Sequence, residues 1–448
     1  MKTKLTELWH SIKSSYWFVP TVMAVGAILL SFVTVAIDRA IGSREINALG
    51  WLYTGGPEGA RTLLLAISGS MLGVTGVVFS LIIVVLSLTS SQFGPRLLRN
   101  FISSTGTQIV LGTFISAFIY CLLVVRTIRS VEESPFVPHL SVTFATVFGI
   151  ASIGVLIYII NHMSSSIQVV NIIASVAKDL DSGINHLFPE DIGHDEPEQR
   201  PWWRTGGDIP SNFDLQSFPV VALASGYLLA IDNEGLVGIA ARKDIMMCLK
   251  KRPGDFITQG SDLLFVWPGE KVERELVRAI NAAFILGVQR TKTQDILAVV
   301  EQLVEIAIRA LSPGINDPLT AVMCIDRLGA GLCQLAERSA PSPYRYDGEG
   351  KVRVIAMPVT FEEILDTSFS QIRQYGRTSA AVTLRLLETI AVIATRARNE
   401  ESRAALLRHA MMILRGSKEA LPEELDRMDV EQRYQAVVNT LMKRQKFS

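Results

Sequence analysis

The second long apolar stretch of the chain carries small and hydroxyl side chains along one side. They recur at steps of three, four and seven positions, which places them on one face of a helix, and they include Gly69, Gly73, Gly76, Ser80 and Ser87. Gly69 and Gly73 form a GxxxG motif, which lets helix backbones approach closely in a membrane. The pattern predicts a helix-packing face or, if that face borders water along an oligomer axis, the lining of a permeation path.

The end of this stretch becomes polar and then basic. Ser91 and Gln92 follow the apolar residues, a Gly-Pro pair breaks the helix, and Arg96 and Arg99 come next. Arginines at such a position anchor a helix at the membrane interface. A ring of them around an oligomeric pore would instead favour anions. All four residues are therefore candidate pore-lining residues.

A second polar group surrounds the sequence Ser-Pro-Gly-Ile-Asn-Asp-Pro, between two apolar helical segments. It comprises Arg309, Asn316, Asp317 and Asp326. Two helix ends that meet at a polar corner can bind a small anionic ligand at their free amide groups, and these residues are candidate ligand-binding residues. Helix capping together with an internal ion pair is the alternative interpretation.

The sequence lacks the common motifs of catalysis and cofactor binding. It contains no GxxxxGK[ST], HExxH, GxSxG or CxxC pattern. His, Asp and Glu residues gather at 186–196, but such a run in a turn-rich segment is typical of a solvated surface. We therefore expect no enzymatic activity, no cofactor and no metal site.

The composition predicts a membrane part. Of the 448 residues, 49% are hydrophobic and 19% are charged, which excludes a disordered chain, and a net charge of zero gives no field to attract nucleic acid. Four windows lack Asp, Glu, Lys and Arg, at 14–37, 62–95, 100–125 and 134–161. Each is long enough to cross a ~30 Å hydrocarbon core as a helix. We predict a four-helix transmembrane domain at 1–165.

The remaining two thirds of the chain predict an α+β region. A helical extension and linker are expected at 166–217, with the helix continuing directly from the fourth span. Short apolar runs around a Pro-Gly-Asp turn predict a small β-rich module at 218–269. Helical periodicity and capping signals, such as Thr360 with Glu363, predict a helical domain at 270–448. The predicted fold class is an α-helical integral membrane protein of four transmembrane helices followed by a cytoplasmic α+β region.

The cysteines and the number of spans predict the orientation. Cys248, Cys324 and Cys333 show no pairing pattern, which suits a reducing compartment. Basic residues flanking the helices are balanced between the two sides and decide nothing. An even number of spans then places both termini in the cytoplasm.

Two strings of residues resemble a known family. The exit of the second span, FSLIIVVLSLTSSQFGPRLLRNF, and the corner ALSPGINDPLTA are similar to the uncharacterised bacterial membrane-protein family known as domain of unknown function 2254. The resemblance covers nearly the whole chain and implies the same topology in a bacterial inner membrane. It implies no activity and no catalytic residues.

Two functions are compatible with these patterns. The first is a homo-oligomeric channel, in which second helices line the axis and the cytoplasmic region forms a vestibule or gate. Its expected partners are the lipid bilayer, further copies of the chain, and ions or a small ligand, with no nucleic acid. The alternative is a membrane-anchored sensor or scaffold whose cytoplasmic region binds a ligand or a protein.

Overall fold

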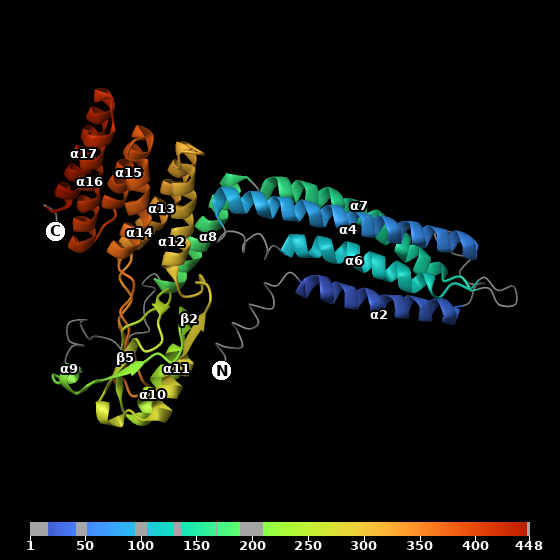
Figure 1. Ribbon diagram of the computed structural model, residues 1–448, viewed down its shortest axis with the longest axis horizontal. Coiled ribbons are helices and arrows are strands. Elements are labelled where there is room, and N and C mark those ends of the chain that lie inside the picture. Colours follow the sequence, from blue (N-terminus) through green and yellow to red (C-terminus); the bar gives the residue numbers. More distant parts are fainter. Residues whose placement is uncertain are drawn as a thin grey trace. The chain divides into compact units, whose positions relative to one another are not determined.

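The computed structural model describes residues 17–41, 52–94, 105–129, 136–166, 168–188 and 209–445. The chain forms two compact units, Met1–Asn171 and Ile172–Ser448. The described part of the first unit is built of helices, and the second combines helices with two sheets (Figure 1).

Four long apolar helices make up most of the described part of the first unit. They are α2 (Phe18–Ile41), α4 (Pro57–Phe93), α6 (Thr105–Val125) and α7 (His139–Ser166). They lie side by side along their lengths (Figure 1). α6 contacts the other three and is the most buried of the four. Its Phe114 and Tyr120 are buried, so the core of this unit follows α6.

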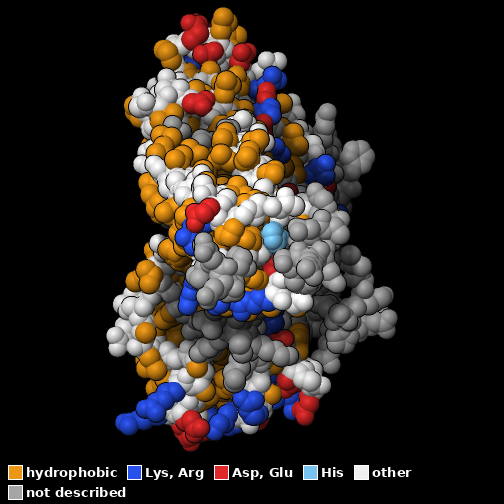
Figure 2. Space-filling model, turned by 90° about the vertical axis from the view of Figure 1, so that its right-hand side faces the viewer, with side chains coloured by type: hydrophobic (Ala, Val, Ile, Leu, Met, Phe, Trp, Pro, Cys, Tyr) orange, Lys and Arg blue, Asp and Glu red, His pale blue; other side chains and the backbone are white. Residues whose placement is uncertain are grey.

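Large hydrophobic side chains cover the outside of these helices. Phe32, Ile150 and Ile157 are each 66% exposed. Hydrophobic side chains are also widely exposed on the face of the molecule drawn in Figure 2. A water-soluble bundle would bury such side chains, whereas lipid accepts them. The outer surface of the first unit therefore suits a bilayer.

By length and composition, five described helices are able to cross a membrane, rather than the four that the charge-free windows predict. The fifth is α13 (Pro318–Glu337), which packs against other helices of the second unit and buries Leu328 and Leu332. Its apolar residues belong to the core of a helical bundle. The windows missed α13 because Asp326 and Arg327 interrupt its apolar sequence.

The helix after the fourth apolar segment is separate from it, and the prediction of one continuous helix is wrong. α7 ends at Ser166, and α8 (Val169–Leu187) begins three residues later. Asn171 Nδ2 donates a hydrogen bond to the carbonyl oxygen of Ser165 at 2.7 Å. Serine and asparagine side chains compete for backbone hydrogen bonds and so favour helix ends. Residues 189–208 of the predicted linker lie outside the described residues.

The second unit contains two sheets. Their strands are β1 (Phe218–Val221), β2 (Gly226–Ile231), β3 (Met246–Leu249), β4 (Phe256–Ile257), β5 (Asp262–Trp267), β6 (Phe284–Gly287), β7 (Tyr344–Tyr346) and β8 (Val352–Ile355). One sheet has the order β1-β5-β3-β8-β7 and the other the order β4-β2-β6. β3 and β8 are parallel, and the other neighbours are antiparallel. Leu228, Met247 and Leu264 belong to the core that the sheets share with α10 (Asn233–Lys243) and α11 (Arg274–Ala283).

The β-rich part is larger than the module predicted at 218–269. β6, β7 and β8 come from the region that was expected to be wholly helical. β6 pairs with β2, and β8 pairs with β3. Strands of three or four residues are too short to display an alternating pattern, and their pairing with distant segments decides their structure.

Helices fill the rest of the second unit. They are α9 (Phe213–Gln216), the 3-10 helix η2 (Gly269–Lys271), α12 (Ile296–Ala310), α13, α14 (Phe361–Gly376), α15 (Ala380–Ala394), α16 (Glu400–Ala420) and α17 (Glu424–Gln445). α12 to α17 pack against one another as a bundle. The capping box predicted from Thr360 and Glu363 is confirmed at the start of α14.

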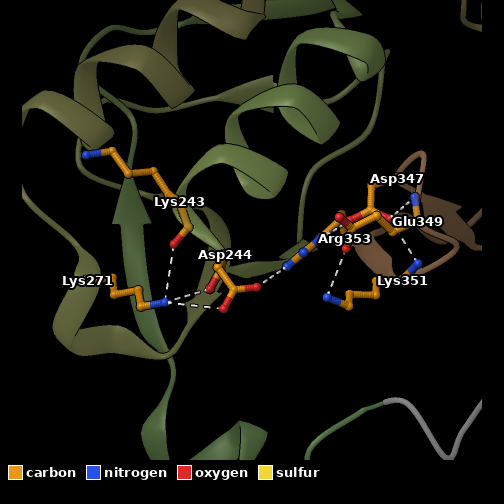
Figure 3. A network of polar contacts seen from close by, with 7 residues as sticks. All are labelled: Lys243, Asp244, Lys271, Asp347, Glu349, Lys351 and Arg353. Atoms are coloured by element: carbon orange, nitrogen blue, oxygen red, sulfur yellow. Dashed lines mark hydrogen bonds and ion pairs between the residues drawn. The ribbon is translucent and has the colours of Figure 1, made fainter.

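A network of charged side chains fastens the β7–β8 hairpin to the end of α10 (Figure 3). Arg353 donates from Nε to Asp347 at 2.6 Å and from Nη1 to Asp244 at 2.8 Å. Lys271 Nζ donates to the carbonyl oxygen of Asp244 at 2.8 Å. The hydrogen bonds from Arg353 lower the pKa of both carboxyl groups, so this connection weakens as the pH falls through their range. The network has a structural role.

His409 on α16 is a buried titratable group. Its Nε2 lies 2.6 Å from Asp366 Oδ1, and its ring packs edge-on against Phe369. Burial lowers the pKa of His409; the hydrogen bond and charge of Asp366 oppose this, and the charges of Arg408 and Arg373 add to it. The unfolded chain, with a histidine pKa of about 6.5, therefore binds this proton more readily. Below about pH 6.5 the fold should lose up to about 1.4 kcal/mol per pH unit through this group.

The substitution His409→Gln tests this pH dependence. Gln keeps a donor toward Asp366 and does not titrate. We expect the melting temperature of the full chain to fall less between about pH 7 and 5 in His409→Gln than in the wild type. Equal pH dependence of the two proteins would contradict a neutral His409 in the fold.

Candidate functional site

The small residues of α4 lie on the side of the helix that faces away from its own bundle. The residues that α4 buries include Leu64, Met71, Val78, Ile82 and Val85. Gly69, Gly73 and Gly76 lie on the opposite side and are exposed. A Cβ atom added at any of these glycines would meet nothing within 4 Å. The stripe therefore does not serve packing within the described part of one chain.

Three serines extend this face. Ser80, Ser87 and Ser91 are exposed at positions that continue the helical spacing of the glycines. We call these six residues, Gly69, Gly73, Gly76, Ser80, Ser87 and Ser91, the small-residue face. Gln92 belongs to α4, but its side chain is not among those that the structure describes. Arg96 and Arg99 lie outside the described residues. A ring of arginines at the end of α4 stays a prediction.

Charged side chains are confined to the ends of the described helices of the first unit. Asp38 and Arg39 lie in the last turn of α2, and Glu58 and Arg61 lie near the start of α4. The small-residue face carries none of them. Any path along it would be lined by hydroxyl groups, glycine backbone and apolar side chains.

Asp38 joins α2 to the start of α7. Its Oδ1 accepts a hydrogen bond from Leu140 N at 2.8 Å, and its Oδ2 accepts from Ser141 N at 3.0 Å and from Ser141 Oγ at 2.7 Å. Asp38 is 3% exposed. A carboxylate at these amide groups satisfies donors that the first turn of a helix leaves open, and it complements the positive end of the helix dipole.

Further polar contacts surround Asp38. Tyr120 Oη donates to the carbonyl oxygen of Ser141 at 3.2 Å and lies 3.0 Å from Thr34 Oγ1. These residues come from α2, α6 and α7, so the contacts join three helices at one end of the bundle. No sequence pattern predicts this cluster. Its only signal was an acidic residue directly after a charge-free window.

Three of the four candidate ligand-binding residues are held by side-chain contacts within the chain. Asp317 caps α13 by accepting from Thr320 N at 3.2 Å and Thr320 Oγ1 at 2.6 Å. Arg385 Nε donates to Asp326 at 2.5 Å. The two other candidates lie before α13: Arg309 Nη2 donates to Glu305 at 3.4 Å, and Asn316 adopts a left-handed conformation with φ 51°. This arrangement accounts for the charges without a ligand, and a ligand site at the corner stays a prediction.

The chain is similar to proteins from mycobacteria. It is 29% identical over 426 residues to Uncharacterized protein Mb1321c of Mycobacterium bovis and to Uncharacterized protein Rv1290c of Mycobacterium tuberculosis. Each alignment covers 93% of this chain and 78% of the relative. No solved structure matches the chain.

The family described as "Predicted membrane protein (DUF2254)" matches residues 13–392, a span that includes both the helices of the first unit and the corner before α13. The chain therefore belongs to this family of predicted membrane proteins.

Proposed function

We propose that the chain forms a homo-oligomeric membrane pore with α4 at its axis. In this proposal α2, α4, α6 and α7 cross a bacterial inner membrane, both termini lie in the cytoplasm, and α4 helices from several copies surround the path. The observation that supports it is the small-residue face, which points away from the bundle of its own chain.

Lipid is a poor partner for such a face. Glycine leaves the helix backbone uncovered and offers few atoms for contact with lipid chains. Two environments suit the small-residue face better than lipid does. One is a closely approaching helix from a second copy, and the other is water on the axis of a ring. A ring of α4 helices supplies both, because neighbouring copies touch at the edges of the face and its centre borders the path.

The length of α4 also fits a pore that continues beyond the bilayer. Its 37 residues correspond to about 55 Å of helix, whereas the hydrocarbon core is ~30 Å thick. The end that carries Ser87 and Ser91 would then project into the cytoplasm. The second unit would surround this exit as a vestibule, and Arg96 and Arg99 would decide whether anions are preferred.

Cysteine labelling tests whether water reaches the small-residue face. The starting protein has its four native cysteines replaced by alanine, since Cys121, Cys248, Cys324 and Cys333 are all free thiols. Single cysteines at Gly76, Ser80 and Ser87 in liposomes should react with a membrane-impermeant methanethiosulfonate reagent. Phe79→Cys, at an exposed position off the small-residue face, and Val78→Cys, on the buried side of α4, are matched controls that should stay unlabelled.

Single-channel recording in bilayers tests conduction itself. The wild type should give discrete current steps, and Ser80→Leu should lower their size roughly twofold or more by adding bulk to the path. Phe79→Leu changes a neighbouring exposed side chain off the face and should leave the current unchanged. No conductance above protein-free bilayers, together with unlabelled cysteines along the face, would exclude the pore and leave an anchored sensor or scaffold.

A further inference from the structure

A pocket of about 630 Å³ opens in the helical bundle of the second unit. It lies between the last turn of α14, the first two turns of α15 and the last turns of α16. Its lining includes Arg373, Arg377 and Arg415 together with Tyr375, Leu386 and Ile413. The volume is in the range of sites that hold small organic molecules.

The three arginines of the pocket form no ion pair within the part of the chain that the structure describes. Within residues 209–445 no carboxylate forms an ion pair with them, although Glu419 also contributes to the lining. Arg373 Nε is buried and makes no hydrogen bond. Burial, and then the charge of Arg415, lower the pKa of Arg373. The pocket therefore carries more positive charge than its single lining carboxylate, Glu419, can neutralise.

Other arginines of the same bundle are paired. Arg385 binds Asp326, Arg396 binds Glu337, and Arg408 binds Asp366. Unlike these arginines, Arg373, Arg377 and Arg415 line one pocket without an ion pair, which indicates that an anion from outside the chain is their partner.

The lining also indicates which kind of anion fits. Guanidinium groups bind phosphate oxygens with two parallel hydrogen bonds. Thr383 of the first turn of α15 also lines the pocket, so the positive end of the dipole of this helix adds to the attraction of an anion. Tyr375, Leu386 and Ile413 offer an apolar wall that inorganic phosphate alone would leave uncovered.

We propose that this pocket binds a small organic phosphate. Arg373, Arg377 and Arg415 hold its phosphate group, and the apolar wall holds its organic part. The proposal is independent of a pore along α4, since all of its residues lie in the second unit. Failure of either proposal leaves the other standing.

Calorimetric titration of the full chain in detergent tests the pocket with three probes. Phenyl phosphate carries both features of the ligand, inorganic phosphate carries only the anion, and phenol carries only the ring. We expect phenyl phosphate to bind about tenfold more tightly than inorganic phosphate, and phenol to give no binding.

Substitutions separate this pocket from general attraction to positive charge. Arg373→Gln and Arg415→Gln, made separately, should each weaken phenyl phosphate binding about tenfold or more. Arg396→Gln removes one charge from the same bundle outside the pocket and should leave binding unchanged. The melting temperatures of the two pocket variants without ligand should not fall, because each substitution relieves repulsion between arginines. Absence of binding by both phosphates, or equal binding by all variants, would overturn the proposal.

A soluble metabolite and a lipid headgroup present the same phosphate chemistry. Nanodiscs of phosphatidylcholine with and without phosphatidic acid distinguish the two sources. If the lipid occupies the pocket, phosphatidic acid should weaken phenyl phosphate binding by competition, and Arg396→Gln should behave as wild type in both. If the ligand is soluble, the affinity should be the same in both nanodiscs. Each outcome supports a phosphate site and assigns its source.

Discussion

Replacing Asp38 by Ala is expected to lower the free energy of unfolding of the full chain in detergent by about 3 kcal/mol or more. The carboxylate accepts three hydrogen bonds at the start of α7, and the substitution leaves the amide groups of Leu140 and Ser141 without an acceptor. Hydrogen bonds to a charged group contribute about 1.5–3 kcal/mol each, and buried donors without partners are costly. Denaturant titration measures the loss, and hydrogen exchange at the first turn of α7 locates it.

Two further variants show whether the effect comes from these hydrogen bonds. Asp38→Asn keeps an oxygen acceptor without the charge, and its loss of stability should be intermediate. Ser141→Ala removes one hydrogen bond but leaves both capped amide groups, at a loss of about 1 kcal/mol. If Asp38→Ala were no more damaging than Ser141→Ala, the cap would not be what holds α2 to α7.

The sequence could predict the long apolar helices of the first unit, because length and the absence of charge decide whether a segment suits a bilayer. It could also predict that the small residues of α4 share one face, since helical spacing alone determines this. It could not predict where Asp38 points. An acidic residue at the end of an apolar window faces either the headgroup layer or a neighbouring helix, and only the packing of α2 against α7 decides between them.

Local signals also set the limits of prediction in the second unit. Thr360 and Glu363 predict the start of α14, because a capping box is made by residues three positions apart. The pairing of β3 with β8 joins residues about a hundred positions apart, and no local pattern marks it. Separation in the sequence also conceals the arginine pocket, since Arg373 and Arg415 come from different helices.

Residues that are close together in the sequence can have unrelated partners in the fold. The sequence places Asp317 and Asp326 at one polar corner between two helices, and a ligand site there stays a prediction. In the fold, Asp317 caps its own helix and Asp326 pairs with Arg385 on α15. Proximity in sequence identified helix ends correctly but not the partners of their charges.

A second buried carboxylate fixes the start of α12. Asp295 is 4% exposed, and its Oδ1 accepts from Ala298 N at 3.1 Å as the N-cap of α12. Its Oδ2 accepts from Arg290 Nε at 2.7 Å, while Arg290 Nη1 donates to Glu301 at 2.6 Å. Burial lowers the pKa of Arg290, but its hydrogen bonds to Asp295 and Glu301 more than compensate and raise it above the ordinary value. Gly254, with φ +100°, lies so close that a Cβ atom there would meet Asp295 Oδ2 at 2.5 Å.

We expect Asp295→Ala to lower the free energy of unfolding by about 3 kcal/mol, because it removes both the cap and the carboxylate that pairs with a half-buried guanidinium. Asp295→Asn keeps an acceptor for the amide group of Ala298 but loses both the charge and the acceptor for Arg290 Nε. It should be less damaging than Asp295→Ala by about 1 kcal/mol, the usual contribution of an N-cap. Hydrogen exchange at Ala298 should accelerate in Asp295→Ala but not in Asp295→Asn. Equal exchange rates in the two variants would mean that the ion pair with Arg290, rather than the cap, determines where α12 begins.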